Sequence, residues 1–169
     1  MDAAKDDSST VRETAYAPRA LADIIRLHMD YYAPTWGFGL PFETKLAVEI
    51  GRFLQRYDAA RDLFACAWKD DDLVGSVTLD GGDIENGLSH LRWFIVSDAA
   101  RGTGLGGRLI TQAVHFAREK SHDGIFLTTF SGLDAARHLY EKAGFTLVHE
   151  SEIDQWGGGV REQRFELRF

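Results

Sequence analysis

Residues 91–110, which read LRWFIVSDAARGTGLGGRLI, decide the fold of this chain. The apolar first half is typical of a buried strand, and the glycine-rich middle leads into the apolar periodicity of a helix. The backbone N–H groups of such a turn point at one spot, where the positive end of the helix dipole adds to them. With Arg101 at the entrance, the turn predicts a seat for a phosphorylated ligand. The alternative is a plain strand-to-helix connection whose glycines only permit positive φ angles.

The rest of the chain supplies strands and helices around this stretch. Apolar and alternating patterns predict strands at 11–16, 62–69, 73–79, 88–96, 124–130, 145–149 and 161–169, and helices at 18–33, 42–57, 104–121 and 134–143. Three aspartates at 70–72 separate two of the strands and indicate an antiparallel hairpin. Segments 31–42 and 80–87 are expected to be loops because of their glycines, prolines or acids. We expect one mixed α/β domain over residues 10–169, after a disordered polar N-terminus at 1–9.

Composition narrows the function classes. The 169 residues, 44% hydrophobic and 27% charged, suit one globular domain with a core and a cleft. A net charge of −7 argues against nucleic-acid binding. The single cysteine, Cys66, lies in an apolar run and is expected to be a core residue. With no secretory signal and no apolar run long enough for a membrane span, we expect a cytoplasmic protein with no membrane partner.

Other ligand sites fit the sequence less well. Gly102, Gly104 and Gly107 match the dinucleotide pattern G-x-G-x-x-G, but the next strand ends without the acidic residue that this site needs. The turn also follows an antiparallel hairpin, which a parallel dinucleotide-binding sheet does not predict. The phosphate-binding G-K-S/T, the zinc motif H-E-x-x-H and the nucleophile elbow G-x-S-x-G are all missing. We expect no metal site.

Two motifs carry a family resemblance. Residues 101–106, RGTGLG, and 139–145, LYEKAGF, resemble the R/Q-x-x-G-x-G/A acyl-CoA loop and the Y-E-K-x-G-F segment of the GCN5-related N-acetyltransferases, the GNAT family. The expected order of elements fits from about residue 10 to the end. Segments WGFGLPFE, LRWFIV, TFSGLDAAR and EQRFE look most like GNAT domains fused to MarR-type DNA-binding regulators. The chain is too short to carry that regulator domain, so no DNA role is expected.

The resemblance implies a fold and a cofactor. The fold would be a mixed, mostly antiparallel sheet, splayed between its fourth and fifth strands and flanked by about four helices. The cofactor would be acetyl-CoA as acyl donor, its pyrophosphate on the glycine turn, its pantetheine arm along the fourth strand, and the oxyanion on the N–H of Phe94 or Ile95. The implied cofactor-binding residues are Phe94, Ile95, Val96, Arg101, Gly102, Thr103, Gly104, Leu105, Gly106, Gly107 and Tyr140.

The implied reaction is acetyl transfer to a primary amine of a small molecule or peptide, by direct attack in a ternary complex. Tyr140 matches the family tyrosine that protonates the leaving sulfur, although its ring could simply pack on the core. The family glutamate that often acts as base would stand at position 90, where this chain has His90. A histidine can accept a proton near neutral pH, but His90 could equally be a hydrogen-bonded strand residue. Glu43, Glu49 and Glu162, acting through water, are the other candidates.

The acceptor side is less defined. Four aromatic residues and one acid are expected there: Trp36, Phe38, Phe42, Trp156 and Glu43. The alternative is that these rings only pack on the core. The loop acids Asp83, Glu85 and Asp154 could attract a cation or could simply be solvated. A CoA-binding sensor without catalysis remains the alternative function, because the strand glutamate is missing. The family often forms homodimers, so a homodimer is possible here too.

Overall fold

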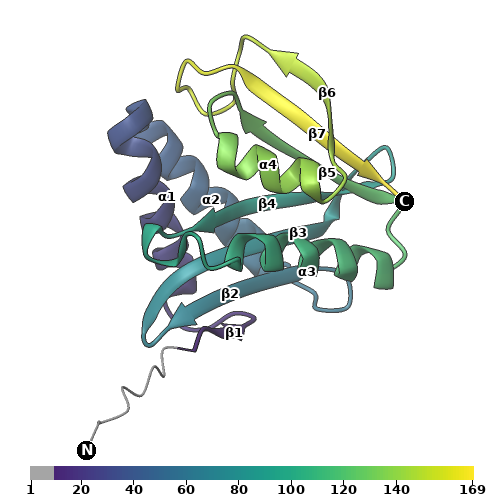
Figure 1. Cartoon of the computed structure of the whole chain (residues 1–169), viewed down its shortest axis with the longest axis horizontal. Helices are drawn as coiled ribbons and strands as arrows, with labels where there is room; N and C mark the ends of the chain where they lie inside the picture. Colours follow the sequence, from purple (N-terminus) through teal and green to yellow (C-terminus); the bar gives the residue numbers. More distant parts are fainter. Residues whose placement is uncertain (1–9) are drawn as a thin grey trace, which may run out of the picture.

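The computed structural model describes residues 10–169, so the prediction for residues 1–9 lies outside the described residues. The described chain forms a seven-stranded sheet with four α-helices and one short 3₁₀ helix (Figure 1). The strands are β1 (Arg12–Thr14), β2 (Leu63–Lys69), β3 (Asp72–Glu85), β4 (Leu88–Val96), β5 (Gly124–Phe130), β6 (Thr146–Ser151) and β7 (Glu162–Arg168). The helices are α1 (Ala20–Trp36), α2 (Leu40–Gln55), η1 (Asp98–Ala100), α3 (Leu105–Glu119) and α4 (Asp134–Lys142).

The sheet has the order β1-β2-β3-β4-β5-β7-β6, and neighbours are antiparallel except for β4 and β5. The parallel pairing of β4 and β5 covers Ser89 with Ile125 and His90 with Phe126, and within residues 10–169 it extends no further. The two strands therefore part after His90. This confirms the predicted mixed, mostly antiparallel sheet that splays between its fourth and fifth strands. The position of β7, between β5 and β6, had not been predicted.

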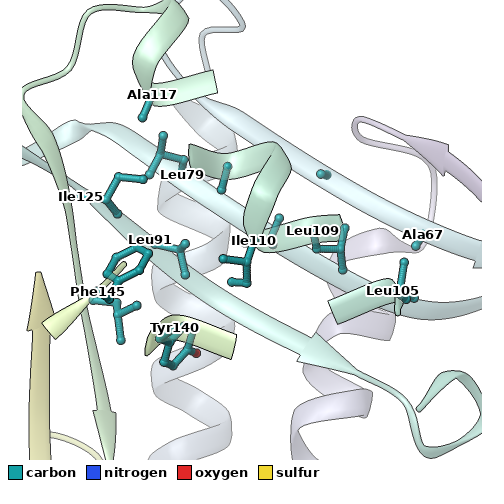
Figure 2. Close-up of a cluster of buried hydrophobic side chains, with 14 of the residues drawn as sticks. Ala67, Leu79, Leu91, Leu105, Leu109, Ile110, Ala117, Ile125, Tyr140 and Phe145 are labelled. Carbon is teal, nitrogen blue, oxygen red and sulfur yellow. The ribbon is translucent and has the colours of Figure 1, made fainter. Parts of the chain in front are cut away.

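Helices cover both faces of the sheet. In Figure 1, α3 and α4 lie in front of the sheet and α1 and α2 lie behind it. The front core packs Leu105 and Leu109 of α3 and Tyr140 of α4 against β-strand side chains such as Leu91 (Figure 2). The back core packs the first two helices against a second set of strand side chains, among them Phe64, Cys66, Trp68, Trp93 and Ile95. Cys66 is thus fully buried, as its apolar surroundings in the sequence indicated.

A bulge in β4 changes which face its side chains occupy. Leu91 packs in the front core, but Trp93, two residues later, packs in the back core. Residues two apart share a face in a regular strand. The exchange occurs because Trp93 has a φ of 49° and the register with β3 shifts between Ser76 and Thr78. The Ser76 hydroxyl donates a hydrogen bond to the Trp93 carbonyl at 3.1 Å and so holds the bulge in place.

The prediction of a loop at 31–42 was wrong for most of its length. Helix α1 runs through Pro34 to Trp36, and α2 begins at Leu40, which leaves only three residues between them. Pro34 lies in the last turn of α1, and Pro41 lies in the first turn of α2. At these positions the missing proline N–H removes few helical hydrogen bonds. Gly37, with a φ of 69°, ends α1 and donates its N–H to the carbonyl of Ala33 at 3.0 Å.

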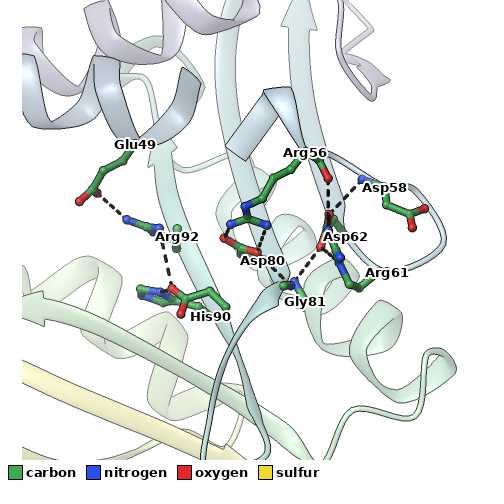
Figure 3. A network of polar contacts seen from close by, with 11 residues as sticks. Glu49, Arg56, Asp58, Arg61, Asp62, Asp80, Gly81, His90 and Arg92 are labelled. Carbon is green, nitrogen blue, oxygen red and sulfur yellow. Dashed lines mark hydrogen bonds and ion pairs between the residues drawn. The ribbon is translucent and has the colours of Figure 1, made fainter. Parts of the chain in front are cut away.

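The prediction of a loop at 80–87 was also wrong, because β3 continues to Glu85. Two fully buried carboxylates hold the irregular part of the strand (Figure 3). Asp80 accepts hydrogen bonds from Arg56 at 2.9 and 2.5 Å and from the Gly82 N–H at 3.0 Å. Asp62 accepts hydrogen bonds from Arg61 at 2.9 Å and from the Gly81 N–H at 2.9 Å. The polar segment is ordered because its acids are paired, an effect that composition alone does not reveal.

We predict that Arg56→Ala lowers the free energy of unfolding by about 3 kcal/mol, because it leaves the Asp80 carboxylate buried without its cation. Arg52→Ala is the matched control, since Arg52 lies one turn earlier on α2 and is exposed. Its cost should stay within about 0.5 kcal/mol. Urea denaturation at pH 7 measures both values. Equal losses for the two variants would contradict the role of the Arg56–Asp80 pair.

Candidate functional site

The glycine turn leaves a row of amides at the start of α3. Gly102 and Gly104 have φ angles of 75° and 81°, a region that side chains other than glycine rarely occupy. The Thr103 hydroxyl donates a hydrogen bond to the Ala100 carbonyl at 2.5 Å and accepts one from the Leu105 N–H at 3.4 Å, which braces the turn. The helical hydrogen bonds begin with the Arg108 N–H, which donates to the Gly104 carbonyl at 3.1 Å. The N–H groups of Gly106 and Gly107, which come before it in the helix, have no such partner among the described residues and are therefore available to an anion.

A cavity of about 430 Å³, here called the loop cavity, lies against this turn. Tyr31 and Tyr32 of α1 and several residues of α4 complete its wall. Most of the predicted cofactor residues line it: Phe94, Ile95, Val96, Arg101, Gly102, Gly104, Leu105, Gly106 and Gly107. Thr103 and Tyr140 do not. The first braces the turn, and the second lines a neighbouring cavity.

Two residues of the turn, Arg101 and Gly106, shape this part of the molecule. Arg101 is 43% exposed, lies over the Tyr31 ring at 4.6 Å and pairs with Asp98 at 3.0 Å, so its charge stays at the rim of the loop cavity. A Cβ atom at Gly106 would lie 2.8 Å from Leu139 Cδ1 and 3.4 Å from Phe94 Cζ. Glycine at this position lets α3 approach α4 and β4 closely.

A second cavity of about 100 Å³, here called the splay cavity, lies where β4 and β5 part. It shares Tyr32, Phe94 and Leu133 with the loop cavity, so the two adjoin. The residues that line the splay cavity come from α1, α2, both strands, α4 and the segment before β7. They include His28, Tyr32, Phe42, Lys45, Glu49, His90, Arg92, Phe94, Thr128, Phe130, Tyr140, Gln155 and Trp156.

The predicted acceptor residues divide into two groups. Phe42 and Trp156 line the splay cavity. Phe38 lies behind Phe42, with ring centroids 4.8 Å apart, and Trp36 packs edge-on against Phe130 at 5.4 Å. Glu43 is exposed and lines neither cavity. The aromatic cluster is thus partly a cavity wall and partly the support behind it.

Tyr140 combines a packed ring with a hydroxyl at the splay cavity. Its ring contacts those of Phe94, Phe145 and Phe165, with centroids 5.9 to 6.1 Å apart. The hydroxyl makes no hydrogen bond within residues 10–169. Burial raises the pKa of the Tyr140 phenol above its usual value, and Tyr32 raises it further. The hydroxyl is therefore protonated at neutral pH and able to donate.

His90 is held by Asp83, a carboxylate in a segment that the sequence predicted to be a loop. Its Nδ1 atom lies 2.8 Å from Asp83 Oδ2, and its ring stacks on Phe126 at 4.2 Å. Burial lowers the pKa of His90 below its usual value, even though Asp83 acts in the opposite direction. The ring is neutral at pH 7, with Nδ1–H donated to Asp83 and a lone pair on Nε2. The Asn86–Gly87 pair, typical of a hairpin turn, was the signal that could have placed Asp83 near His90.

The other candidate bases have partners. Glu49 pairs with Lys45 at 2.5 Å. It also pairs with Arg92 at 2.5 Å, as Figure 3 shows. Glu162 accepts hydrogen bonds from the backbone and side chain of Gln155 at 3.0 and 3.3 Å and lines neither cavity. The Glu49 carboxylate is thus held by two ion pairs, one with Lys45 and one with Arg92.

The loop acids that could have attracted a cation are also engaged. Asp83 contacts His90, and Glu85 pairs with Arg164 at 2.6 Å. Asp154 accepts hydrogen bonds from four backbone N–H groups, those of Trp156, Gly158, Gly159 and Val160. Burial alone would raise the pKa of Asp154, but these N–H groups lower it below its usual value. Asp154 therefore shapes its own loop.

His28, a buried residue of α1, also lines the splay cavity. Its position at helical spacing among apolar residues gave no indication that it lines a cavity. Among the described residues, no group of three or more His, Cys, Asp or Glu side chains could hold a metal ion. None of the helices in residues 10–169 is long and apolar enough to cross a membrane.

Comparison with known proteins identifies the fold. A sequence model described as the Acetyltransferase (GNAT) family matches residues 21–145. No curated protein matches the sequence. Many solved structures do match the fold. A GNAT-family acetyltransferase from Staphylococcus aureus Mu50 has a TM-score of 0.75 at 16% identity, over 94% of this chain and 99% of that one.

Two further solved structures extend this likeness. Ribosomal-protein-alanine N-acetyltransferase from Brucella melitensis has a TM-score of 0.72 at 17% identity and covers 94% of this chain and 99% of its own. The protein yncA from Salmonella typhimurium, solved with its cofactor acetyl-CoA, has a TM-score of 0.68 at 16% identity, over 95% of this chain and 94% of its own. Because the family model spans most of the sequence and the splayed sheet agrees with it, this chain belongs to the acetyltransferase (GNAT) family.

Proposed function

We propose that this protein is an acetyl-CoA-dependent N-acetyltransferase that moves the acetyl group to a primary amine of a small molecule or peptide. The observation that carries the proposal is the meeting of two cavities at the point where β4 and β5 part. One cavity has a row of free amides for phosphates, and the other holds a neutral histidine and a protonated tyrosine. A donor in the first and an acceptor in the second would meet beside Phe94.

The loop cavity suits the donor. The amides at the start of α3 and the Arg101 guanidinium would bind the pyrophosphate of acetyl-CoA. The backbone of Phe94, Ile95 and Val96, unpaired on the β5 side, would hydrogen-bond to the pantetheine arm, as an added strand does. An N–H of Phe94 or Ile95, beyond the bulge at Trp93, would stabilise the oxyanion formed from the thioester carbonyl.

The splay cavity suits the amine and the proton transfers. An alkyl ammonium has a pKa of about 10.4 and must lose a proton before it attacks. His90 is neutral, and Asp83 fixes its tautomer, so its Nε2 atom would accept that proton while Asp83 stabilises the cation that results. The neutral nitrogen would then attack the thioester carbon and form a tetrahedral oxyanion. When this intermediate collapses, the C–S bond breaks and the Tyr140 hydroxyl would protonate the departing sulfur. The second proton on the nitrogen would pass to the Tyr140 phenolate oxygen, which leaves the amide, the CoA thiol and a neutral Tyr140.

The proposed function is tested by measuring acetyl-CoA binding and acetyl transfer separately. Calorimetry with acetyl-CoA tests the loop cavity, and thiol release with a panel of primary amines tests transfer. Release of CoA that depends on an amine supports the enzyme. Saturable binding without turnover on a broad panel supports the alternative, a CoA-binding sensor, which the missing strand glutamate leaves open.

We predict that Gly102→Ala weakens acetyl-CoA binding at least tenfold. An alanine at a φ of 75° costs about 1–2 kcal/mol, so the turn shifts and its amides lose their alignment. Gly37→Ala is the matched control, since Gly37 has a φ of 69°, equally open surroundings and no place in either cavity. Calorimetry should show wild-type affinity for Gly37→Ala. Equal weakening in both variants would attribute the effect to general destabilisation.

We predict that Tyr140→Phe lowers kcat at least tenfold and leaves the affinity for acetyl-CoA within twofold of wild type. The phenylalanine ring keeps the contacts with Phe94 and Phe145, so only the proton donor is removed. Steady-state kinetics and calorimetry provide the two readouts. Tyr57→Phe, at a ring that packs on Phe53 outside both cavities, is the control. Unchanged turnover of Tyr140→Phe would exclude Tyr140 as the acid.

We predict that Asp83→Asn lowers the pKa of His90 further. The hydrogen bond and charge of Asp83 both raise that pKa against burial, and the substitution removes the charge. NMR titration of the His90 ring measures the shift without any substrate. Asp98→Asn, at a side chain that is 89% exposed, is the control and should leave the His90 titration unchanged. A wild-type titration in Asp83→Asn would show that Asp83 does not support His90.

A further inference from the structure

His28, on α1, lines the splay cavity but takes no part in the chemistry proposed above. Its side chain is 4% exposed, and its ring stacks on Tyr32 at 6.0 Å between centroids. The Nδ1 atom lies 2.7 Å from the carbonyl oxygen of Ile24, one helical turn earlier. A carbonyl oxygen only accepts hydrogen bonds, so Nδ1 carries the hydrogen and Nε2 carries a lone pair.

The Nε2 atom of His28 makes no hydrogen bond within the described residues. In residues 10–169, two side-chain polar atoms are both fully enclosed and without a hydrogen-bond partner, Thr78 Oγ1 and Ser97 Oγ. His28 Nε2 is not one of them, so part of its surface is accessible. Nδ1 faces the backbone of its own helix, so Nε2 lies on the other edge of the ring, toward the cavity that His28 lines. Nε2 is therefore an acceptor without a partner among the described residues, on a ring edge that a molecule in the cavity can reach, and a ligand with an N–H or O–H group can donate a hydrogen bond to it.

His28 keeps this acceptor at working pH. Burial lowers the pKa of His28 to about 4, although the Ile24 carbonyl acts in the opposite direction. The ring is therefore neutral at pH 7. The titratable or charged groups that line the same cavity are Tyr32 on α1, Lys45 and Glu49 on α2, His90 and Arg92 on β4, and Tyr140 on α4. Lys45 and Arg92 each pair with Glu49, and burial keeps both tyrosines protonated.

We propose that Nε2 of His28 accepts a hydrogen bond from an N–H of the acceptor amine and thereby aims the nitrogen lone pair at the thioester carbon. A neutral primary amine has two hydrogens and one lone pair, so holding one hydrogen restricts the direction of attack. His90 removes the proton that the amine must lose, whereas His28 holds a hydrogen that stays on the nitrogen until the C–N bond forms. This inference rests on the proposed acetyl transfer and assigns the acceptor side of that site.

Two substitutions separate the two edges of the ring. In His28→Asn, the amide nitrogen takes the place of Nδ1 and keeps the bond to the Ile24 carbonyl, but Nε2 is lost. In His28→Gln, the amide oxygen reaches about as far as Nε2. We expect kcat/KM for the amine to fall about tenfold to 100-fold in His28→Asn and to recover in part in His28→Gln. The affinity for acetyl-CoA should not change. His115→Asn, at a side chain that is 72% exposed, is the matched control.

The pH profile distinguishes His28 from His90. His28→Asn should lower kcat/KM at every pH above the His28 pKa of about 4, where the His28 ring is unprotonated, and leave the midpoint of the acidic limb in place, because that limb reports His90. His90→Ala should move or abolish the acidic limb. If His28→Asn and His28→Gln both keep the wild-type kcat/KM for every amine that reacts, the inference is wrong and His28 is only a core residue.

A second readout needs no turnover. The ring nitrogens of the ¹⁵N-labelled, CoA-bound protein are observed by NMR, and the His28 signals are assigned by their absence in His28→Asn. The probes are n-propylamine, spermidine and a tripeptide with a free N-terminus, each at up to 50 mM. A shift of the Nε2 signal with any of these amines supports the inference, and no shift with all of them overturns it. Because this result does not depend on catalysis, loss of the proposed activity and loss of the His28 role remain distinguishable.

Discussion

The separation of β4 from β5 after His90 is the constraint on which the site depends. A sheet that stayed paired would bury the backbone of Phe94 to Val96 in hydrogen bonds and leave no cavity between the helices. The bulge at Trp93 lies beyond the point of separation and moves the side chains that follow it to the opposite faces. Phe94 then packs toward Tyr140, and Trp93 packs toward Phe53. A single irregular residue thus connects the packing of both cores with the geometry of the cavities.

Most charged side chains at the splay cavity are paired with other side chains of the protein. Glu49 is neutralised by Lys45 and Arg92, and Asp83 is held by His90. The two histidines that face the cavity, His28 and His90, are neutral because burial opposes their charged forms. Such a cavity does not attract an ammonium ion by net negative charge. It offers two acceptors, His28 and His90, to a nitrogen that has entered, and a proton donor, Tyr140.

Sequence reasoning was most reliable where a residue's role is local. The glycines at 102 and 104 take positive φ angles, and the elements around them follow the apolar periodicity closely. It was least reliable at 31–42 and 80–87, where composition indicated loops. Both segments are regular because of partners distant in sequence: aromatic side chains such as Phe130 for the first, and Arg56 and Arg61 for the second. Prolines, glycines and acids predict loops only where no distant residue pairs with the acids or packs against the segment.

By itself, the sequence determined the strand, the glycine turn and the helix that follows, since these depend on backbone conformations that residues 91–110 favour directly. It also brought Arg101, Tyr140 and His90 forward as candidates through motif and spacing. Only the tertiary structure decided which side chains meet. It joined Asp83 to His90, took Glu43 away from the cavities and placed His28 within one of them. The reason is that periodicity gives the face of an element on which a residue lies, whereas the partner across that face depends on how the strands and helices of the whole chain pack.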